Sequence, residues 1–108
     1  MSFYMVQGRY SKESFKAMAT SDTDRRDVVG KMLDQVNGKL HGYYFAFGAS
    51  DFVVILEAPD SVSIASVAIA VGSSDAVQNI TTTPLLSYEE GMQAIRGAAD
   101  FTYTPPGQ

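Results

Sequence analysis

The feature that most constrains the fold is a pair of apolar runs around a short turn in the middle of the chain. The first run is Tyr43–Phe47, the turn is Gly-Ala-Ser-Asp at 48–51, and the second run is Phe52–Leu56. Apolar runs of this length around a glycine-containing turn predict a β-hairpin. Both runs are apolar at consecutive positions, whereas a strand with one face in water alternates apolar and polar residues. We therefore expect both faces of the hairpin to be covered, which requires an assembly larger than the monomer.

Four further segments flank the hairpin. Residues 2–9 and 76–83 predict strands, because β-branched and aromatic side chains are frequent in them. Residues 21–36 and 60–71 predict helices, because their apolar side chains recur every three or four positions. The resulting order, strand-helix-strand-strand-helix-strand, is that of the ferredoxin-like split βαβ fold, an α+β architecture with one antiparallel sheet. The first and third strands are central in this fold, and the third is the most continuously apolar segment here.

Serine and aspartate residues indicate where several helices begin. Ser11–Thr20 predicts one or two helical turns that lie outside the core pattern. Ser21 with Asp24 three residues later resembles a capping box and predicts the start of the next helix. Asp60 or Ser61 is the expected N-cap of the helix over residues 60–71. Ser87 with Glu90 is a second capping box and predicts an extra helix near the C-terminus.

The C-terminal helix and the residues after it set the domain boundary. We expect Met92, Ile95 and Ala99 to face inward, since they lie on one side of a helix. The segment 101–108 is too rich in proline to continue a helix. The sequence therefore predicts one domain over residues 1–100 and a Pro-rich tail over 101–108.

Composition excludes several classes of function. The 108 residues carry twelve acidic and eight basic side chains, and the basic residues are scattered instead of forming the stripe of a nucleic-acid-binding protein. Cysteine is absent, which excludes disulfides, thiolate nucleophiles and cysteine-ligated metals. No apolar run approaches the roughly 20 residues that span a bilayer, and the first residues lack the basic region of a secretory signal. We expect a cytoplasmic protein that binds neither nucleic acid nor membranes.

The hairpin turn predicts which side chains share a face. If Gly48 and Asp51 bracket a two-residue turn, residue 47 pairs with 52, 45 with 54 and 43 with 56. One face would then carry His41, Tyr43, Phe45, Phe47, Phe52, Val54 and Leu56. The other would carry Gly42, Tyr44, Ala46, Val53, Ile55 and Glu57. Either face can be ordinary packing, or it can line a cavity in which tyrosine hydroxyls and an ionisable group orient a ligand.

Five residues are candidates for ligand binding, each beside a structural alternative. Tyr43, Tyr44 and Glu57 belong to the hairpin faces just described. His41 is the only histidine, and it is either a half-exposed strand residue or an ionisable group near neutral pH. Arg9 either pairs with an acidic group such as Glu57 or Asp51, or binds an anionic ligand.

Other polar residues predict structure and not chemistry. Asp51 is expected to organise the turn with Gly48 by accepting backbone N–H bonds. Arg25 and Arg26 follow two aspartates in the first turn of a helix and predict a solvated charged face. A lone histidine with distant carboxylates is a poor metal site. We therefore expect no metal and no cofactor.

The chain resembles the GYD domain family of small bacterial and archaeal proteins. The resemblance covers about residues 3 to 99 and is carried by Val6–Tyr10, Asp24–Arg26, Gly42–Gly48, Glu57–Asp60 and Thr83–Leu86, together with Asp51. Ser50 stands where the family's Gly-Tyr-Asp signature usually has tyrosine. The resemblance implies the dimeric α/β-barrel superfamily, in which two ferredoxin-like protomers pack sheet to sheet.

No firm activity comes with the resemblance. Relatives of this architecture include cofactor-independent monooxygenases, isomerising enzymes and ligand-sensing domains, and a shared fold does not assign a function. We expect a homodimer, paired through the sheet face, that binds a small apolar or aromatic molecule. One alternative is a monooxygenase- or isomerase-like enzyme that uses Tyr44, His41 or Arg9 to polarise an oxygen and shift a proton. A second alternative is a structural or regulatory dimer without a ligand.

Overall fold

The computed structural model describes all 108 residues and contains four strands and four helices. In chain order they are β1 (Ser2–Tyr10), α1 (Lys12–Thr20), α2 (Arg25–Asp34), β2 (Lys39–Phe45), β3 (Phe52–Ala58), α3 (Ser61–Gly72), β4 (Val77–Leu85) and α4 (Tyr88–Ala98). None of the helices has the length and apolar character needed to cross a bilayer.

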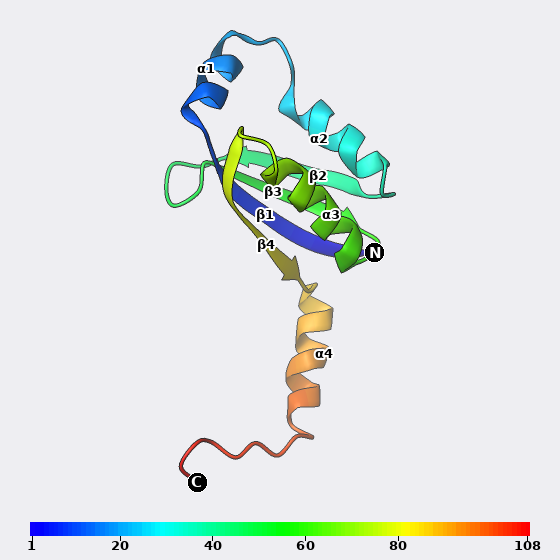
Figure 1. The fold of residues 1–108 in the computed structure, drawn as a ribbon. Coiled ribbons are helices and arrows are strands. Elements are labelled where there is room, and N and C mark those ends of the chain that lie inside the picture. The colour runs from blue at the N-terminus through cyan, green and yellow to red at the C-terminus, as the bar shows by residue number, and fades with distance from the viewer.

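The strands form one antiparallel sheet in the order β2-β3-β1-β4. This order confirms the ferredoxin-like prediction, with the first and third strands in the centre. Helices α2 and α3 cover one face of the sheet (Figure 1). The predicted hairpin is β2 and β3, and the predicted apolar stripe of α3 faces the sheet.

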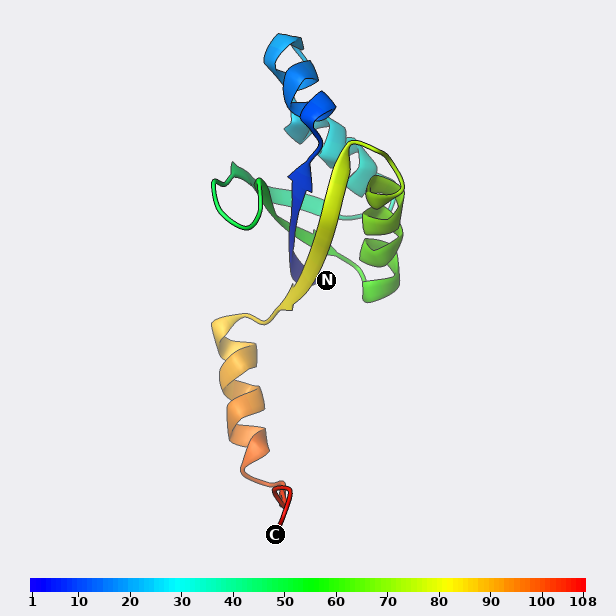
Figure 2. The ribbon, with the colours of Figure 1, turned by 60° about the vertical axis from the view of Figure 1, so that its left-hand side comes forward.

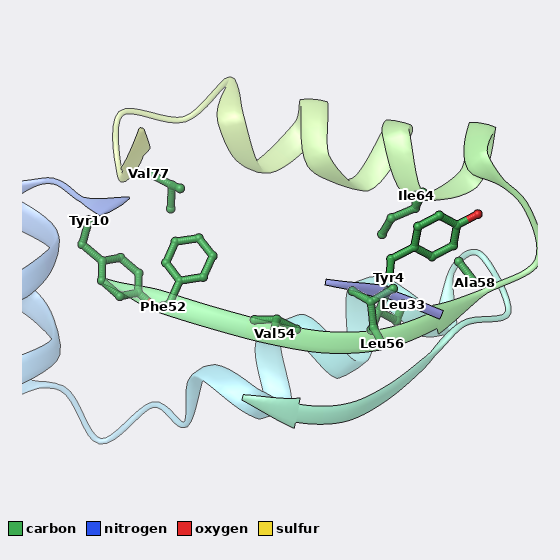
Figure 3. Close-up of a cluster of buried hydrophobic side chains, with 9 residues drawn as sticks. All are labelled: Tyr4, Tyr10, Leu33, Phe52, Val54, Leu56, Ala58, Ile64 and Val77. Atoms are coloured by element: carbon green, nitrogen blue, oxygen red, sulfur yellow. The ribbon is translucent and has the colours of Figure 1, made fainter. Parts of the chain in front are cut away.

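The core lies between the sheet and these two helices (Figure 3). Strand β3 alternates buried and half-buried residues along its whole length, with its buried side chains toward α3. The buried residues are Tyr4, Tyr10, Leu33, Phe52, Val54, Leu56, Ala58, Ile64 and Val77. Gly8 belongs to the same inner side, because a Cβ there would lie 2.7 Å from the Phe52 ring. The small residue lets an aromatic ring lie directly over the backbone of β1.

The register of the hairpin differs from the predicted one by two residues. Phe45 pairs with Phe52, and Tyr43 pairs with Val54. The connecting loop is therefore residues 46–51, longer than the two-residue turn predicted. Because the shift is an even number, Tyr43 and Phe45 still share a face with Phe52 and Val54. Phe47 lies in the loop and is fully exposed, so its predicted place in the apolar wall was wrong.

A β-bulge moves His41 to the opposite face from the one predicted. The register shifts between Leu40 and Gly42, so His41 is the extra residue of β2. Such a bulge re-aims the side chain that it contains. His41 points to the side of Glu57 and stacks on Phe3, with ring centroids 4.8 Å apart.

Helix starts agree with the capping predictions at two places out of three. Asp60 caps α3, and Ser87 with Glu90 forms the capping box of α4. The start of α2 is different: its N-cap is Asp24, whose carboxylate accepts from the Arg26 backbone N–H. Asp24 is itself a strong N-cap residue, so the helix begins three residues later than the Ser21 capping box predicted.

Helix α4 points away from the rest of the molecule (Figure 1, Figure 2). None of its residues is buried, and Ile95 is 66% exposed. The prediction that Met92, Ile95 and Ala99 face the core of their own chain was therefore wrong. The linker Leu86–Ser87 continues the direction of β4 instead of turning the helix back onto the sheet.

The second face of the sheet carries no helix. We call it the open face. Its side chains come from Phe3, Met5, Gln7 and Arg9 of β1, Lys39, His41 and Tyr44 of β2, Val53, Ile55 and Glu57 of β3, and Gln78, Thr81, Thr83 and Leu85 of β4. Phe3 is 40% exposed and Tyr44 is 59% exposed. Six of these side chains are apolar, and four of the six, from Phe3, Met5, Val53 and Ile55, lie on the two central strands β1 and β3.

Candidate functional site

A small cavity lies between the sheet and the helices α2 and α3. Its volume is about 60 Å³, and fourteen of its fifteen lining residues are hydrophobic. They come from all four strands and both helices, and include Val6, Val29, Val54, Leu56, Ile64 and Val67. The one charged side chain in the lining is Arg25. The cavity is therefore an apolar space with a single cationic group.

Two tyrosines supply the other polar atoms of this cavity. The hydroxyls of Tyr10, from the end of β1, and Tyr43, from β2, form a short hydrogen bond. Burial, followed by the hydrogen bond from Tyr43, raises the pKa of Tyr10 far above its ordinary range. Tyr10 is therefore a neutral phenol at physiological pH. One of the two hydroxyl protons is used in the mutual hydrogen bond, and the other can be donated to a ligand oxygen.

Arg25 stands at the mouth of the cavity. Arg25 and Tyr43 also line an outer hollow of about 480 Å³, which is more open and about half polar. The inner cavity alone is smaller than the roughly 300 Å³ typical of a ligand site, whereas the outer hollow exceeds it. Because Arg25 and Tyr43 line both spaces, the two spaces adjoin. The outer hollow is the polar entrance, and the inner cavity is its apolar end.

The neighbouring charges leave Arg25 without an ion pair. Arg26 grips the Asp24 carboxylate, with Nη2 at 2.6 Å and Nε at 3.0 Å. This side-chain bond and the bond from the Arg26 backbone N–H lower the pKa of Asp24 to about 2. The three ion pairs of the structure do not include Arg25. The prediction of a solvated charged face suits Arg26, but Arg25 is half-buried at the cavity.

Arg9, Gly48 and Asp51 lie together at the loop between β2 and β3, apart from the cavity. The Arg9 guanidinium donates to the carbonyls of Gly48 and Ala49, at 3.3 and 3.0 Å, and lies 3.8 Å from the Asp51 carboxylate. The Asp51 carboxylate accepts a hydrogen bond from the Tyr10 backbone N–H at 3.0 Å. The backbone N–H of Asp51 donates to the Gly8 carbonyl at 2.7 Å. These bonds attach the loop to the end of β1.

Asp51→Ala is expected to lower the free energy of unfolding by about 1–3 kcal/mol, because the half-buried N–H of Tyr10 loses its acceptor. Asp51→Asn keeps an acceptor oxygen and is expected to cost less than half as much. Urea denaturation of the two variants beside the parent protein measures the difference. Equal losses in the two variants would contradict an acceptor role and indicate that the negative charge itself is required.

His41, Tyr44 and Glu57 lie on the open face and not at the cavity. His41 Nε2 is 2.6 Å from Glu57 Oε1. The Tyr44 ring lies over Gly42, where a Cβ would come within 2.8 Å of it. Of the five residues proposed from the sequence for ligand binding, only Tyr43 lines the cavity.

Sequence reasoning missed Arg25 and Tyr10. Arg25 looks like an ordinary first-turn residue, and only the docking of α2 onto the sheet shows where it points. Tyr10 could have been found from the sequence. Strand alternation places it on the same face of β1 as Tyr4, Val6 and Gly8.

The match to a family model decides the family. The model of the GYD domain matches residues 4–95 of the 108. The chain belongs to the GYD domain family. A comparison with curated proteins gave no match. The matched residues of this GYD domain include most of β1, the other three strands and the helices α1 to α3, so the cavity, the outer hollow and all of the open face except Phe3 lie inside the matched region.

Proposed function

We propose that this GYD domain is a homodimer that binds a small apolar molecule carrying an acidic oxygen, with the acidic end at Arg25. The observation that supports the proposal is the unpaired guanidinium of Arg25 in a cavity whose other lining residues are hydrophobic. A half-buried cation attracts an anion more strongly than an exposed one, because less water screens it.

The hydroxyl pair of Tyr10 and Tyr43 adds a second reason for the cavity to bind an acid with oxygen atoms. Burial raises the pKa of Tyr10, which keeps its hydroxyl protonated, and the hydroxyl pair of Tyr10 and Tyr43 can donate one proton outward. A carboxylate has lone pairs for both the guanidinium and this hydroxyl. A ligand ammonium would face the Arg25 charge, and the one carboxylate of the outer hollow, that of Asp24, is already engaged by Arg26.

The two volumes indicate a short ligand. The inner cavity of about 60 Å³ admits only a few carbon atoms, while the acidic end and any further atoms lie in the outer hollow. Short-chain monocarboxylates of about six carbons therefore suit the combined shape, since such sites bury most of the ligand.

The open face supports the homodimer. It presents Phe3, Met5, Tyr44, Val53 and Ile55 on a surface that no helix of the chain covers. Contiguous apolar surface of this kind marks an interaction site. A second copy offers the same surface, and a two-fold axis makes it self-complementary.

The binding test uses three probes with the same carbon chain. Hexanoate, 1-hexanol and hexylammonium are titrated against the protein, and the midpoint of thermal unfolding is measured, since a ligand of the native state raises it. We expect the largest shift with hexanoate, a smaller shift with hexanol and none with hexylammonium. In Arg25→Gln, hexanoate binding should weaken at least tenfold, because a charge-assisted bond contributes about 1.5–3 kcal/mol.

The matched control is Lys31→Gln, which removes one positive charge from an exposed position of the same helix, outside both the cavity and the outer hollow. It should bind hexanoate as the parent protein does. Equal loss in both variants, or an equal response to all three probes, would contradict recognition of an acid by Arg25.

A further inference from the structure

The most conspicuous surface left unused by the proposed site is on α4. Tyr88, Met92 and Ile95 recur at spacings of four and three and form one stripe, whereas Gln93 lies on the other side. Tyr88 is 79% and Ile95 66% exposed. We call α4 with its linker and tail, residues 86–108, the arm.

An arm of this kind needs a partner to be stable. Helix α4 has eleven residues, and isolated helices shorter than about 12–15 residues are marginal in water. Its capping box and its Glu89 and Arg96 favour helix at the two ends but bury no apolar surface. The stripe is the part that burial would stabilise, and its own domain leaves it uncovered (Figure 1).

A second exposed apolar group lies at the opposite end of the sheet. Phe47, in the loop between β2 and β3, is fully exposed. The pairing register of β1 shows that the arm and the loop between β2 and β3 lie at opposite ends of the sheet. Phe3 pairs with Leu85, which leads into the arm, while Gly8 pairs with Phe52, which follows the loop.

We propose that the arm of one copy packs its stripe against Phe47 of a second copy, and that the second copy's arm does the same in return. The proposal rests on the homodimer proposed above. When two open faces meet about a two-fold axis that crosses the strands, the arm end of each copy lies beside the loop end of the other. The arm also leaves the sheet on the side away from α3, which is the side that the second copy would occupy (Figure 2).

The area of the interface supports a contribution from the arm. Two strands of nine residues and two of seven, at about 3.3 Å per residue and about 4.8 Å apart, give an open face of roughly 500 Å² in projection. A stable dimer buries about 800 Å² on each partner. One side of a helix about 16 Å long and 10 Å wide adds roughly 160 Å². The sheet face together with the arm therefore approaches the standard area, which the sheet face alone does not reach.

The test measures the dimer dissociation constant of full-length variants by sedimentation equilibrium. Ile95→Glu places a charge in the stripe, and Phe47→Glu places one in the loop that the stripe is proposed to contact. Each is expected to weaken the dimer at least thirtyfold. The control Gln93→Glu adds the same charge on the other side of α4 and should change the constant less than threefold. The double variant should be little weaker than either single variant, because both changes remove one shared contact.

A second measurement locates the contact. The chain contains no cysteine, so a nitroxide attached to Gln93→Cys labels one position only. In a mixture of labelled protein and ¹⁵N-labelled parent protein, amide signals of the parent at Phe47 and Gly48 should broaden. If the dimer dissociation constants of Ile95→Glu and Phe47→Glu equal that of the parent protein, the proposed exchange of arms is wrong. The homodimer would still stand. A parent protein that remains an 11.7 kDa monomer at 100 µM would overturn the homodimer itself, and the arm proposal with it.

Discussion

Leu56→Ala is expected to lower the free energy of unfolding by about 2–5 kcal/mol, a large part of the stability of a domain this size. Leu56 is 2% exposed and lies in the middle of β3, where its side chain meets α3 and the cavity wall. The truncation removes buried methyl groups and enlarges a space that is already present. Urea denaturation followed by circular dichroism measures the loss.

The control for Leu56→Ala is Ile69→Ala on α3, because Ile69 is 68% exposed and loses a similar number of atoms. Its expected effect is within about 0.5 kcal/mol, as for most surface substitutions. Similar losses at the two positions would contradict the placement of the core between β3 and α3.

Gly8→Ala is expected to lower the free energy of unfolding by about 1–3 kcal/mol through overpacking. The new Cβ would lie 2.7 Å from Cζ of Phe52 and 3.2 Å from the Gln78 carbonyl oxygen. Neither neighbour can move freely, because Phe52 is 5% exposed and the carbonyl belongs to the backbone of β4. Thermal unfolding of the variant measures the cost.

Two further variants make the Gly8 prediction specific. Gly48→Ala should change stability by less than about 0.5 kcal/mol, since nothing lies within 4 Å of a Cβ there. Phe52→Leu should reduce the additional cost of Gly8→Ala, because the shorter side chain leaves room for the methyl group. A full cost of Gly8→Ala in the Phe52→Leu background would show that the ring is not the obstacle.

Local signals in the sequence were sufficient to predict the element order and the sheet topology. The hairpin, the stripe of α3 and the capping residues Asp60 and Ser87 depend on neighbours within a few positions, and all agree with the structure. The central place of β3 followed from the ferredoxin-like element order, in which the first and third strands are central.

The hairpin register could not be predicted, because contacts from another strand set it. The loop is held by Asp51, which bonds to Gly8 and Tyr10 of β1, and by the Arg9 guanidinium on the loop carbonyls. The turn residues alone favoured a tighter connection. The bulge at His41 has no local signature either, so the face of this histidine was predicted wrongly.

The candidate site could be predicted only in part for a similar reason. Tyr43 followed from strand alternation, but Arg25 reaches the cavity because α2 crosses β2 at a particular position, which is a property of helix docking. The exposure of α4 was missed because an apolar stripe predicts that a surface is covered and does not say by which chain.

The most direct test of the proposed site is a methyl NMR titration of the parent protein with hexanoate. We predict that the methyl signals of Val54, Ile64 and Val67, which line the cavity, shift together with the Arg25 side-chain N–H signal. The methyl signals of Val53 and Ile55, on the open face, should stay in place. Shifts confined to Val53 and Ile55, or no shift of any of these signals at about 50-fold molar excess of hexanoate, would contradict a ligand site between the sheet and the helices.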